Sequence, residues 1–168
     1  MPPATSLLSV IEAGLKDMLA PLLGPGGESL RSVTVGEFKG ADGIGDVLDQ
    51  HRTRMPGLIL SVPDVAVTQR PDRLLDLRLT YGILIGFADR RDQDARRAFL
   101  FTLHDELAAR LWLQRIPCVG LPVNSVDVVR PSSVLFAVDA GDGIAALYAS
   151  FDVPVRGWNI NTPALPGR

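Results

Sequence analysis

The apolar positions near the start of the chain follow the spacing of an α-helix. They recur every three or four residues, which places them on one stripe of a helix from about Thr5 to Leu23. Thr5 or Ser6 can cap its first turn, and the Gly-Pro-Gly-Gly run at 24–27 ends it. The stripe consists of Leu7, Leu8, Ile11, Leu15, Met18, Leu19 and Leu22.

A two-residue period governs the middle of the chain. Large apolar residues alternate with smaller or polar ones from Leu75 to Phe87, which predicts a strand with one buried face. At about 3.4 Å per residue this strand would extend roughly 44 Å, whereas most strands have about five or six residues. Gly82 and Gly86 suggest a bend or a bulge. The length also suggests that one end projects and pairs with a neighbouring molecule, because part of its backbone would lack partners.

The rest of the pattern adds short strands and a second helix. Asp92 or Asp94 can cap a helix that runs to about Arg115. Glycine and charged residues break any period between Lys39 and Pro56, so a long polar loop is expected there, with one short helical turn near 47–48. Strands are expected at 30–38, 57–62, 126–128, 134–138 and 147–155, with a hairpin turn at 139–143.

These elements predict an α+β fold, with a mainly antiparallel sheet, a long central strand and two helices packed on one face. Residues 1–158 are expected to form one domain, and residues 159–168, rich in Asn, Pro and Gly, an extended tail. The strand face and the second helical stripe should share one core, made of Leu77, Leu79, Tyr81, Ile83, Leu103, Leu107 and Leu111.

Composition narrows the class of protein. Hydrophobic residues make up 46% of the 168 residues and charged residues 21%, as in a globular rather than a disordered chain. The formal net charge of -2 argues against a general nucleic-acid binder, so no sequence-specific nucleic-acid contact is expected. No apolar run approaches the about 18 residues of a membrane span, and no signal peptide is recognisable, so we expect a cytoplasm-like compartment and no membrane.

Candidate catalytic chemistry is sparse. A nucleophile needs a base within hydrogen-bond reach. Cys118 is the only cysteine, and its candidate bases are His51 and His104. A small buried thiol beside a surface histidine is the simpler interpretation.

Binding motifs for ions are equally weak. Asp42, Asp46 and Asp49 do not match the alternating ligand spacing of a calcium loop. The glycine-rich run at 40–45 is not followed by the lysine of a phosphate loop. We therefore predict no catalytic residue, no cofactor and no metal site.

The arginines offer a surface for partners instead. Four of them crowd the start of the second predicted helix among aspartates, which indicates either a mixed-charge cap or a patch for an acidic partner or phosphate backbone. Trp and Arg are favoured interface residues. One of each, Arg156 and Trp158, occurs near the end of the last strand, and the polar loop offers charged residues. The interface candidates are Arg90, Arg91, Arg96, Arg97, Arg156, Trp158, Asp46, Arg52 and Arg54.

The order of these elements resembles a family of small tail-morphogenesis proteins of Mu-like phages and prophages, which shares the tail-terminator fold. The resemblance lies in the opening helix, the strand at 75–87, the helix start Asp-Gln-Asp-Ala-Arg-Arg at 92–97, and the closing Phe-Asp-Val-Pro-Val-Arg-Gly-Trp at 151–158. It is a likeness of pattern over most of the chain, without a diagnostic motif.

The resemblance implies a homo-oligomeric ring, commonly a hexamer, that caps the tail tube at its head-proximal end and supports head-tail joining. It implies as partners the tail tube protein and a head-tail connector or sheath protein. The place would be the virion tail, assembled in the host bacterial cytoplasm. The family offers no catalytic residues to carry over, so no enzyme activity is expected.

Two other classes remain. One is a different virion structural role, such as a tube, baseplate or connector component. The other is a small-ligand enzyme with a site built from loops. An enzyme should show a pocket with convergent polar groups and shifted acids, whereas a ring subunit should show flat, self-complementary edges.

Overall fold

The computed structural model describes residues 6–36, 44–51, 55–88, 91–121, 125–137 and 143–159. In these ranges six strands form one mixed sheet of order β1-β2-β4-β6-β5, with β3 also paired to β4, and three helices flank it. The elements are α1 Leu7–Leu19, β1 Arg31–Val35, α2 Ile44–Gln50, β2 Gly57–Ser61, β3 Asp64–Gln69, β4 Leu75–Ala88, α3 Gln93–Leu111, β5 Arg130–Ala137 and β6 Ile144–Trp158. The predicted α+β class and mainly antiparallel sheet are confirmed: β1 and β2 run parallel, and the other pairs run antiparallel.

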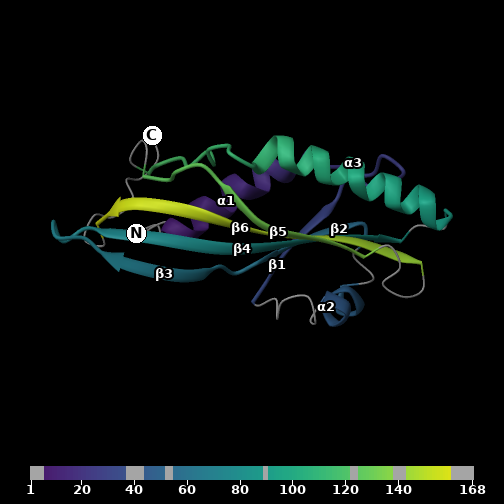
Figure 1. Ribbon diagram of the computed structural model, residues 1–168, viewed down its shortest axis with the longest axis horizontal. Helices are drawn as coiled ribbons and strands as arrows, with labels where there is room; N and C mark the ends of the chain where they lie inside the picture. Colours follow the sequence, from purple (N-terminus) through teal and green to yellow (C-terminus); the bar gives the residue numbers. More distant parts are fainter. Residues whose placement is uncertain are drawn as a thin grey trace, which may run out of the picture.

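Both predicted helices begin at capping residues that the sequence indicated. The Ser9 N–H donates to Ser6 Oγ at 3.1 Å at the start of α1, and the Ala95 N–H donates to Asp92 Oδ1 at 2.8 Å at the start of α3. Each bond satisfies one of the backbone donors that a first helical turn leaves free. These two helices lie on one face of the sheet, as predicted (Figure 1).

Both helices end earlier than predicted, each for a local reason. Pro21 cannot continue α1, because it has no N–H to donate and its ring clashes with the preceding turn. After α3 the backbone of Leu113 turns to a φ of 58°. Its N–H then donates to the Val129 carbonyl oxygen at 2.8 Å, so this segment joins the chain that leads into β5 instead of extending the helix.

The long strand β4 is central and has its partners within the chain. It pairs with β6 from Leu75, opposite Trp158, to Ala88, opposite Ile144. On its other side β2 pairs with the second half of β4 and β3 with the first half. The expectation that part of this backbone needs a neighbouring molecule is therefore wrong, because β3, a strand that the sequence pattern did not predict, supplies the missing partner.

The two glycines of β4 do not mark a bulge. The register between β4 and β6 is regular at both of them and shifts only between Leu75 and Leu77. Gly86 instead makes room for α2, because a Cβ there would lie 2.6 Å from Leu48 Cδ2. The Gly82 N–H donates to Ser61 Oγ at 2.7 Å.

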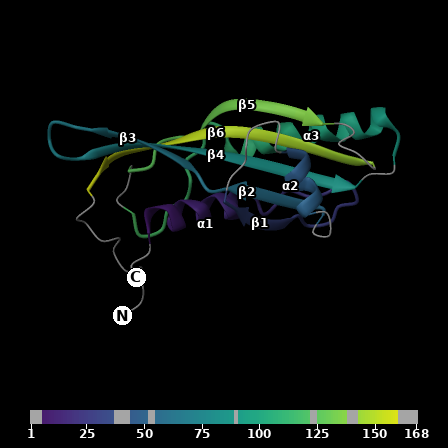
Figure 2. The same ribbon diagram turned by 90° about the horizontal axis from the view of Figure 1, so that it is seen from below.

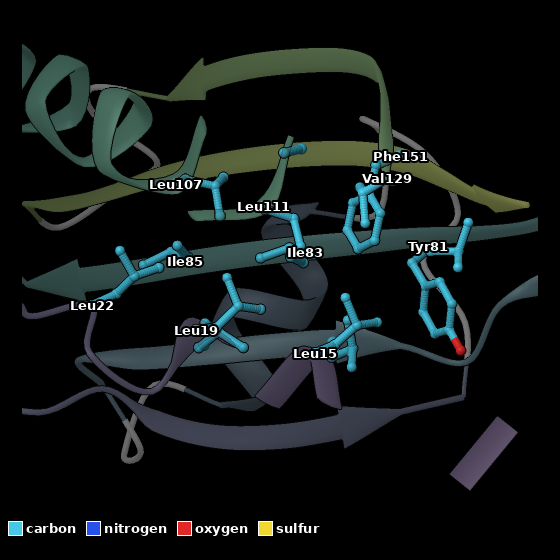
Figure 3. Close-up of a cluster of buried hydrophobic side chains, with 14 of the residues drawn as sticks. Leu15, Leu19, Leu22, Tyr81, Ile83, Ile85, Leu107, Leu111, Val129 and Phe151 are labelled. Carbon is cyan, nitrogen blue, oxygen red and sulfur yellow. The ribbon is translucent and has the colours of Figure 1, made fainter. Parts of the chain in front are cut away.

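The main core lies between the sheet and the helices α1 and α3. Figure 3 shows Tyr81, Ile83 and Ile85 of β4 pointing toward leucines of both helices. The predicted meeting of the alternating strand face with the α3 stripe is confirmed: Leu79, Tyr81, Ile83, Leu103, Leu107 and Leu111 are buried together, and Leu77 packs at the margin.

A third helix occupies part of the predicted polar loop. Helix α2 lies on the opposite face of the sheet (Figure 1), where Leu48, 1% exposed, packs with Ile59 and Leu84. The sheet therefore carries α1 and α3 on one face and the shorter helix α2 on the opposite face. The short helical turn predicted near 47–48 is confirmed and is longer than expected, because Leu48, together with the partly buried Ile44 and Val47, packs on the sheet.

Other strand predictions were partly right. The predicted strand at 126–128 makes only isolated bridges, from Val126 to Val155 and from Val128 to Arg115. Strand β5 begins earlier than predicted and pairs with β6 throughout its length. Thr5, most of the predicted turn at 139–143 and the tail beyond Asn159 lie outside the described residues.

Candidate functional site

A β-hairpin forms one end of the molecule. It consists of β3 and residues 75–80 of β4, paired from Asp64 opposite Thr80 to Gln69 opposite Leu75. Figures 1 and 2 both place it at one end of the long axis, beyond the helices. We refer to these residues as the hairpin.

The hairpin carries apolar side chains that the helices do not cover. Val65 is 46% exposed and Val67 is 58% exposed. Their partners across the ladder are Leu79 and Leu77, so all four side chains share the face that becomes core further along β4. In the described part of the chain β3 pairs only with β4, which leaves its outer backbone edge open.

The arginine cluster lies at the start of α3, at the opposite end of β4. Arg91 places its guanidinium 5.4 Å from the centre of the Phe99 ring, and Arg97 approaches Asp94 at 3.7 Å. Arg96 is half-buried in the first turn. The contact with Asp94 agrees with a mixed-charge cap, and the exposed Arg91 and Arg97 leave the alternative of a partner patch open. Arg90 lies outside the described residues.

Two further predicted interface residues, Arg156 and Trp158, lie at the hairpin end. Arg156 of β6 approaches Asp127 Oδ2 at 3.0 Å, and Arg130 approaches the same oxygen at 3.5 Å. The N–H of Val128 donates to Asp127, and this bond, together with the two arginines, lowers the pKa of that carboxyl. The half-buried Trp158 ends β6 opposite Leu75.

The structure therefore separates the predicted interface residues into two groups. The α3 group and the β6 group lie at opposite ends of β4 and do not form one site. Asp46 is exposed on α2, away from both. Arg52 and Arg54 lie outside the described residues. Two distant surfaces on one subunit are what a head-to-tail contact between copies requires.

The thiol and its candidate bases do not form an activated nucleophile. His104 Nδ1 lies 3.1 Å from Asp105 Oδ1, and its ring packs against aromatic side chains. Cys118 is half-buried, and burial raises the pKa of its thiol. A raised pKa leaves less thiolate at neutral pH, the reverse of what a nucleophilic cysteine needs.

A polar hollow of about 470 Å³ opens on the face of the sheet that α2 covers in part. Its hydroxyl groups bond to the sheet itself: Thr80 donates to Asp152 Oδ1 at 2.6 Å, and Ser133 and Ser150 share a bond of 2.7 Å. Burial raises the pKa of the Tyr148 phenol, which lines the hollow. These groups form a hydrogen-bonded sheet surface rather than a base beside a nucleophile.

An aromatic row that sequence reasoning missed lies between α3 and the edge strand β5. Phe101 and Phe136 meet edge to face, with ring centroids 5.3 Å apart. His104 continues the row, 5.7 Å from Phe136 and 5.0 Å from Trp112. Phe101 is 50% exposed and Phe136 is 40% exposed. The row joins α3 to the edge strand β5, so only the folded chain brings its members together.

The described residues offer no metal-binding cluster and no membrane-spanning helix. None of their His, Cys, Asp and Glu side chains gather in groups of three or more that could hold a metal ion. Asp42 of the predicted acidic loop lies outside this part of the chain. Among the helices described, none is long and apolar enough to cross a membrane.

Comparison with known proteins yields little. No known protein family matches the chain, and no curated protein matches it. One solved chain with a similar arrangement comes from the "Virion of native gene transfer agent (GTA) particle", with a TM-score of 0.47 and 10% sequence identity over 92% of this chain and 98% of that chain. A likeness at this level supports no inference about function, so the resemblance to Mu-like tail proteins stays a prediction.

Proposed function

We propose that the protein is a structural subunit of a phage-type virion, and that copies of it join head to tail into a closed ring of the tail-terminator kind. The ring would cap the tail tube at its head-proximal end. Its partners would be the tail tube protein and a head-tail connector or sheath protein. Six subunits is the number that the sequence resemblance implies.

The observation that carries this proposal is the hairpin. Its outer edge is open, Val65 and Val67 are exposed, and it extends beyond the helices at one end of the molecule (Figure 2). An open edge with exposed β-branched residues pairs readily with another chain. A contact that uses each end once closes into a ring when the rotation between copies allows it, and this protects the edge from open-ended aggregation.

The second surface of the contact is the start of α3. Arg91 and Arg97 are exposed there, at the end of the molecule opposite the hairpin. Arginine suits forked ion pairs between subunits. The hairpin offers exposed acids to such a contact: Asp64, on β3, and Asp72, in its turn.

The test changes the hairpin without touching the core. The double substitution Val65→Lys, Val67→Lys places two charges on the exposed edge, and we expect it to abolish ring formation seen by negative-stain imaging at high protein concentration or on isolated tails. The control Val119→Lys alters a residue that is 79% exposed in the segment after α3, and its rings should match those of the parent.

The outcomes separate the candidate roles. Rings that persist in the double variant would show that the hairpin does not make the contact. Long tubes instead of closed rings would favour a tube component over a terminator. A monomer in every condition, with a small ligand bound in the polar hollow, would favour the enzyme alternative.

A further inference from the structure

We infer that two free copies of the protein pair through the exposed side of α3. The two helices run antiparallel, around a two-fold axis that passes beside Phe101. This contact differs from the head-to-tail contact of the proposed ring, and it needs no residue of the hairpin. The partner is a second copy of this chain, and the apolar and charged side chains of α3 both indicate it.

Helix α3 presents a large uncovered apolar side chain near its middle. Its leucine stripe is buried against the sheet, whereas Phe101 lies outside that stripe and is 50% exposed. Phe101 touches Phe136 of β5, which is 40% exposed. Figure 1 shows no other described element beyond the outer side of α3. Two adjacent rings at the surface form an apolar patch of the kind that marks a contact with another protein.

The charges around Phe101 suit a copy of the same helix. Arg97 precedes Phe101 by four residues and Asp105 follows it by four, so all three lie on one side of α3. The side chain of Arg97 is 60% exposed and that of Asp105 is 82% exposed. When two antiparallel copies of α3 place Phe101 opposite Phe101, Arg97 of each copy lies opposite Asp105 of the other. The two-fold axis therefore gives two ion pairs, one on each side of the two rings.

The other charges of the helix agree with this register. Asp94 lies opposite the small Ala108, and within the described helix no two like charges come opposite each other. A parallel arrangement would instead place Arg97 against Arg97 and Asp105 against Asp105, and like charges across an interface oppose association. The exposed Ala98 beside the contact leaves room for the helices to approach to about 8–10 Å.

Arg97 is available for this contact. Within its own subunit it approaches Asp94 at 3.7 Å, and the Asp94 side chain is 92% exposed. Such an exposed pair contributes about 0–1 kcal/mol, so exchanging it for a pair across the two-fold axis costs little. One helix against one helix buries a small area, below about 1,200 Å², which is typical of weak and reversible contacts. The pair is therefore expected to form and dissociate readily.

The pair and the ring compete for Arg97. This consequence rests on the proposed function, whereas the pairing itself does not. In the proposed ring Arg97 belongs to the start of α3, which contacts the hairpin of the next copy. In the pair Arg97 contacts Asp105 instead, so a paired copy cannot use that surface for the ring. The pair thus acts as a reversible store of subunits that limits ring closure in the free protein.

The test is sedimentation equilibrium of the full-length protein from about 1 μM to about 1 mM. The hairpin variant Val65→Lys, Val67→Lys is measured alongside, because the loss of rings in it leaves the pairing equilibrium alone. We expect a monomer–dimer equilibrium in that variant. It should weaken several-fold when the salt concentration rises from about 0.05 M to about 0.5 M, because salt screens exposed ion pairs.

Charge exchange identifies the contact. Arg97→Asp should weaken dimerisation at least about tenfold, because it places carboxylates opposite each other at both ends of the contact. Asp105→Arg should weaken it as much, by placing arginines opposite each other. The double variant Arg97→Asp, Asp105→Arg restores both ion pairs, and its dissociation constant should return to within about threefold of the parent value. Both positions are exposed, so all three variants should fold.

The matched control is Arg110→Asp. It reverses an exposed charge of the same helix, nine residues from Phe101 and so on the opposite side of α3. Its dissociation constant should stay within about twofold of the parent value. Asp105→Arg also tests the competition, since it breaks the pair and leaves the start of α3 unchanged. Its rings should form at a lower protein concentration than those of the parent, and an unchanged concentration would reject the competition.

Three results would overturn the pairing: a hairpin variant that stays monomeric at every concentration, a dimer that neither single reversal weakens, or reversals whose effect the double variant does not restore. These results are distinct from failure of the ring. Rings from a protein that shows no dimer reject the pairing and keep the proposed function. A dimer that follows the charge exchange, in a protein that never forms rings, keeps the pairing and rejects the proposed function.

Discussion

The two halves of β4 share one alternating pattern but differ in what covers them. From Tyr81 to Phe87 every residue is buried, with α1 and α3 over one face and α2 over the other (Figure 1). From Leu75 to Thr80 only Leu79 is fully buried, and the neighbours there are the strands β3 and β6. The same alternating pattern thus gives a continuous run of buried residues where helices cover both faces, and a single buried residue, Leu79, where they do not.

The two halves of β4 therefore contribute differently to stability. The covered half brings together large side chains from α1, α3 and β4 (Figure 3), and burial of such side chains contributes about 1.5–3 kcal/mol each. The uncovered half satisfies its backbone through β3 and β6, and the exposed apolar side chains beside it are Val65 and Val67 of β3. If a partner binds there as proposed, we expect the core to stay unchanged.

The largest contrast should come from one charge placed in each half of this arrangement. Ile83→Asp, in the covered half, buries an unpaired carboxylate at a residue that is 0% exposed, and it should lower the free energy of unfolding by at least about 3 kcal/mol. Val67→Asp, on the exposed hairpin, should change it by less than about 0.5 kcal/mol. Urea denaturation of both variants measures this, and equal effects would erase the distinction between the halves.

A second contrast compares two glycines in helices on opposite faces. Alanine is the better helix former by about 1 kcal/mol. A Cβ at Gly14 of α1 nevertheless clashes with the Pro117 carbonyl oxygen and Ile116, so Gly14→Ala should destabilise by about 1–3 kcal/mol. Gly45 of α2 has open space around its Cα, and Gly45→Ala should stabilise by up to about 1 kcal/mol. Thermal melts that give both changes the same sign would contradict the packing of α1.

Tyr81 begins the covered half and should make stability depend on pH. Burial, followed by the negative charges of Glu12 and Cys118, raises the pKa of its phenol. The folded state then keeps the proton that an unfolded tyrosine releases near about pH 10. The stability from this group is complete below that pH and falls as pH rises above it, by up to about 1.4 kcal/mol per pH unit.

The variant Tyr81→Phe should remove this part of the pH dependence. The hydroxyl has no hydrogen-bond partner in the described structure, so its loss should leave stability near pH 7 unchanged or raise it by about 1 kcal/mol. Urea melts at pH 9 and 11 test the difference between parent and variant. An identical loss of stability in both would place the titrating group elsewhere.

The smallest effect on stability belongs to the uncovered end. Arg156→Ala removes an exposed ion pair with Asp127, and such pairs contribute about 0–1 kcal/mol. We expect its unfolding free energy to stay within about 1 kcal/mol of the parent in urea melts. A larger loss of unfolding free energy would mean that Arg156 supports the fold of the hairpin end. The variant Arg156→Ala could then not be used to test assembly separately from stability.

The sequence alone predicted those helices and strands whose patterns of apolar and capping residues are local and strong. The caps Ser6 and Asp92, the stripes of α1 and α3, and the alternation of β4 all follow from a few neighbouring residues. Each combines a clear period with a turn or capping signal, so propensity and packing agree.

The parts that sequence missed depend on contacts between distant residues. Strand β3 has only Val65 and Val67 as a pattern, and its identity as a strand comes from pairing with β4. For helix α2 the sequence predicted only a short turn near 47–48, because the contact of Leu48 with Gly86 that extends it is one no local period reveals. The aromatic row likewise unites residues of α3 and β5. The sequence predicted the interface residues only in part. It could not show that the α3 group and the β6 group lie at opposite ends of β4, because that separation depends on the fold.

In the proposed ring, the hairpin of each copy contacts the start of α3 in the next copy. Cryo-electron microscopy of the protein at high concentration, and of tails that carry it, measures this directly. We expect a closed ring in which β3 of every subunit lies against the start of α3 of its neighbour. A protein that stays monomeric in both settings, or a ring whose hairpins all point into solvent, would contradict it.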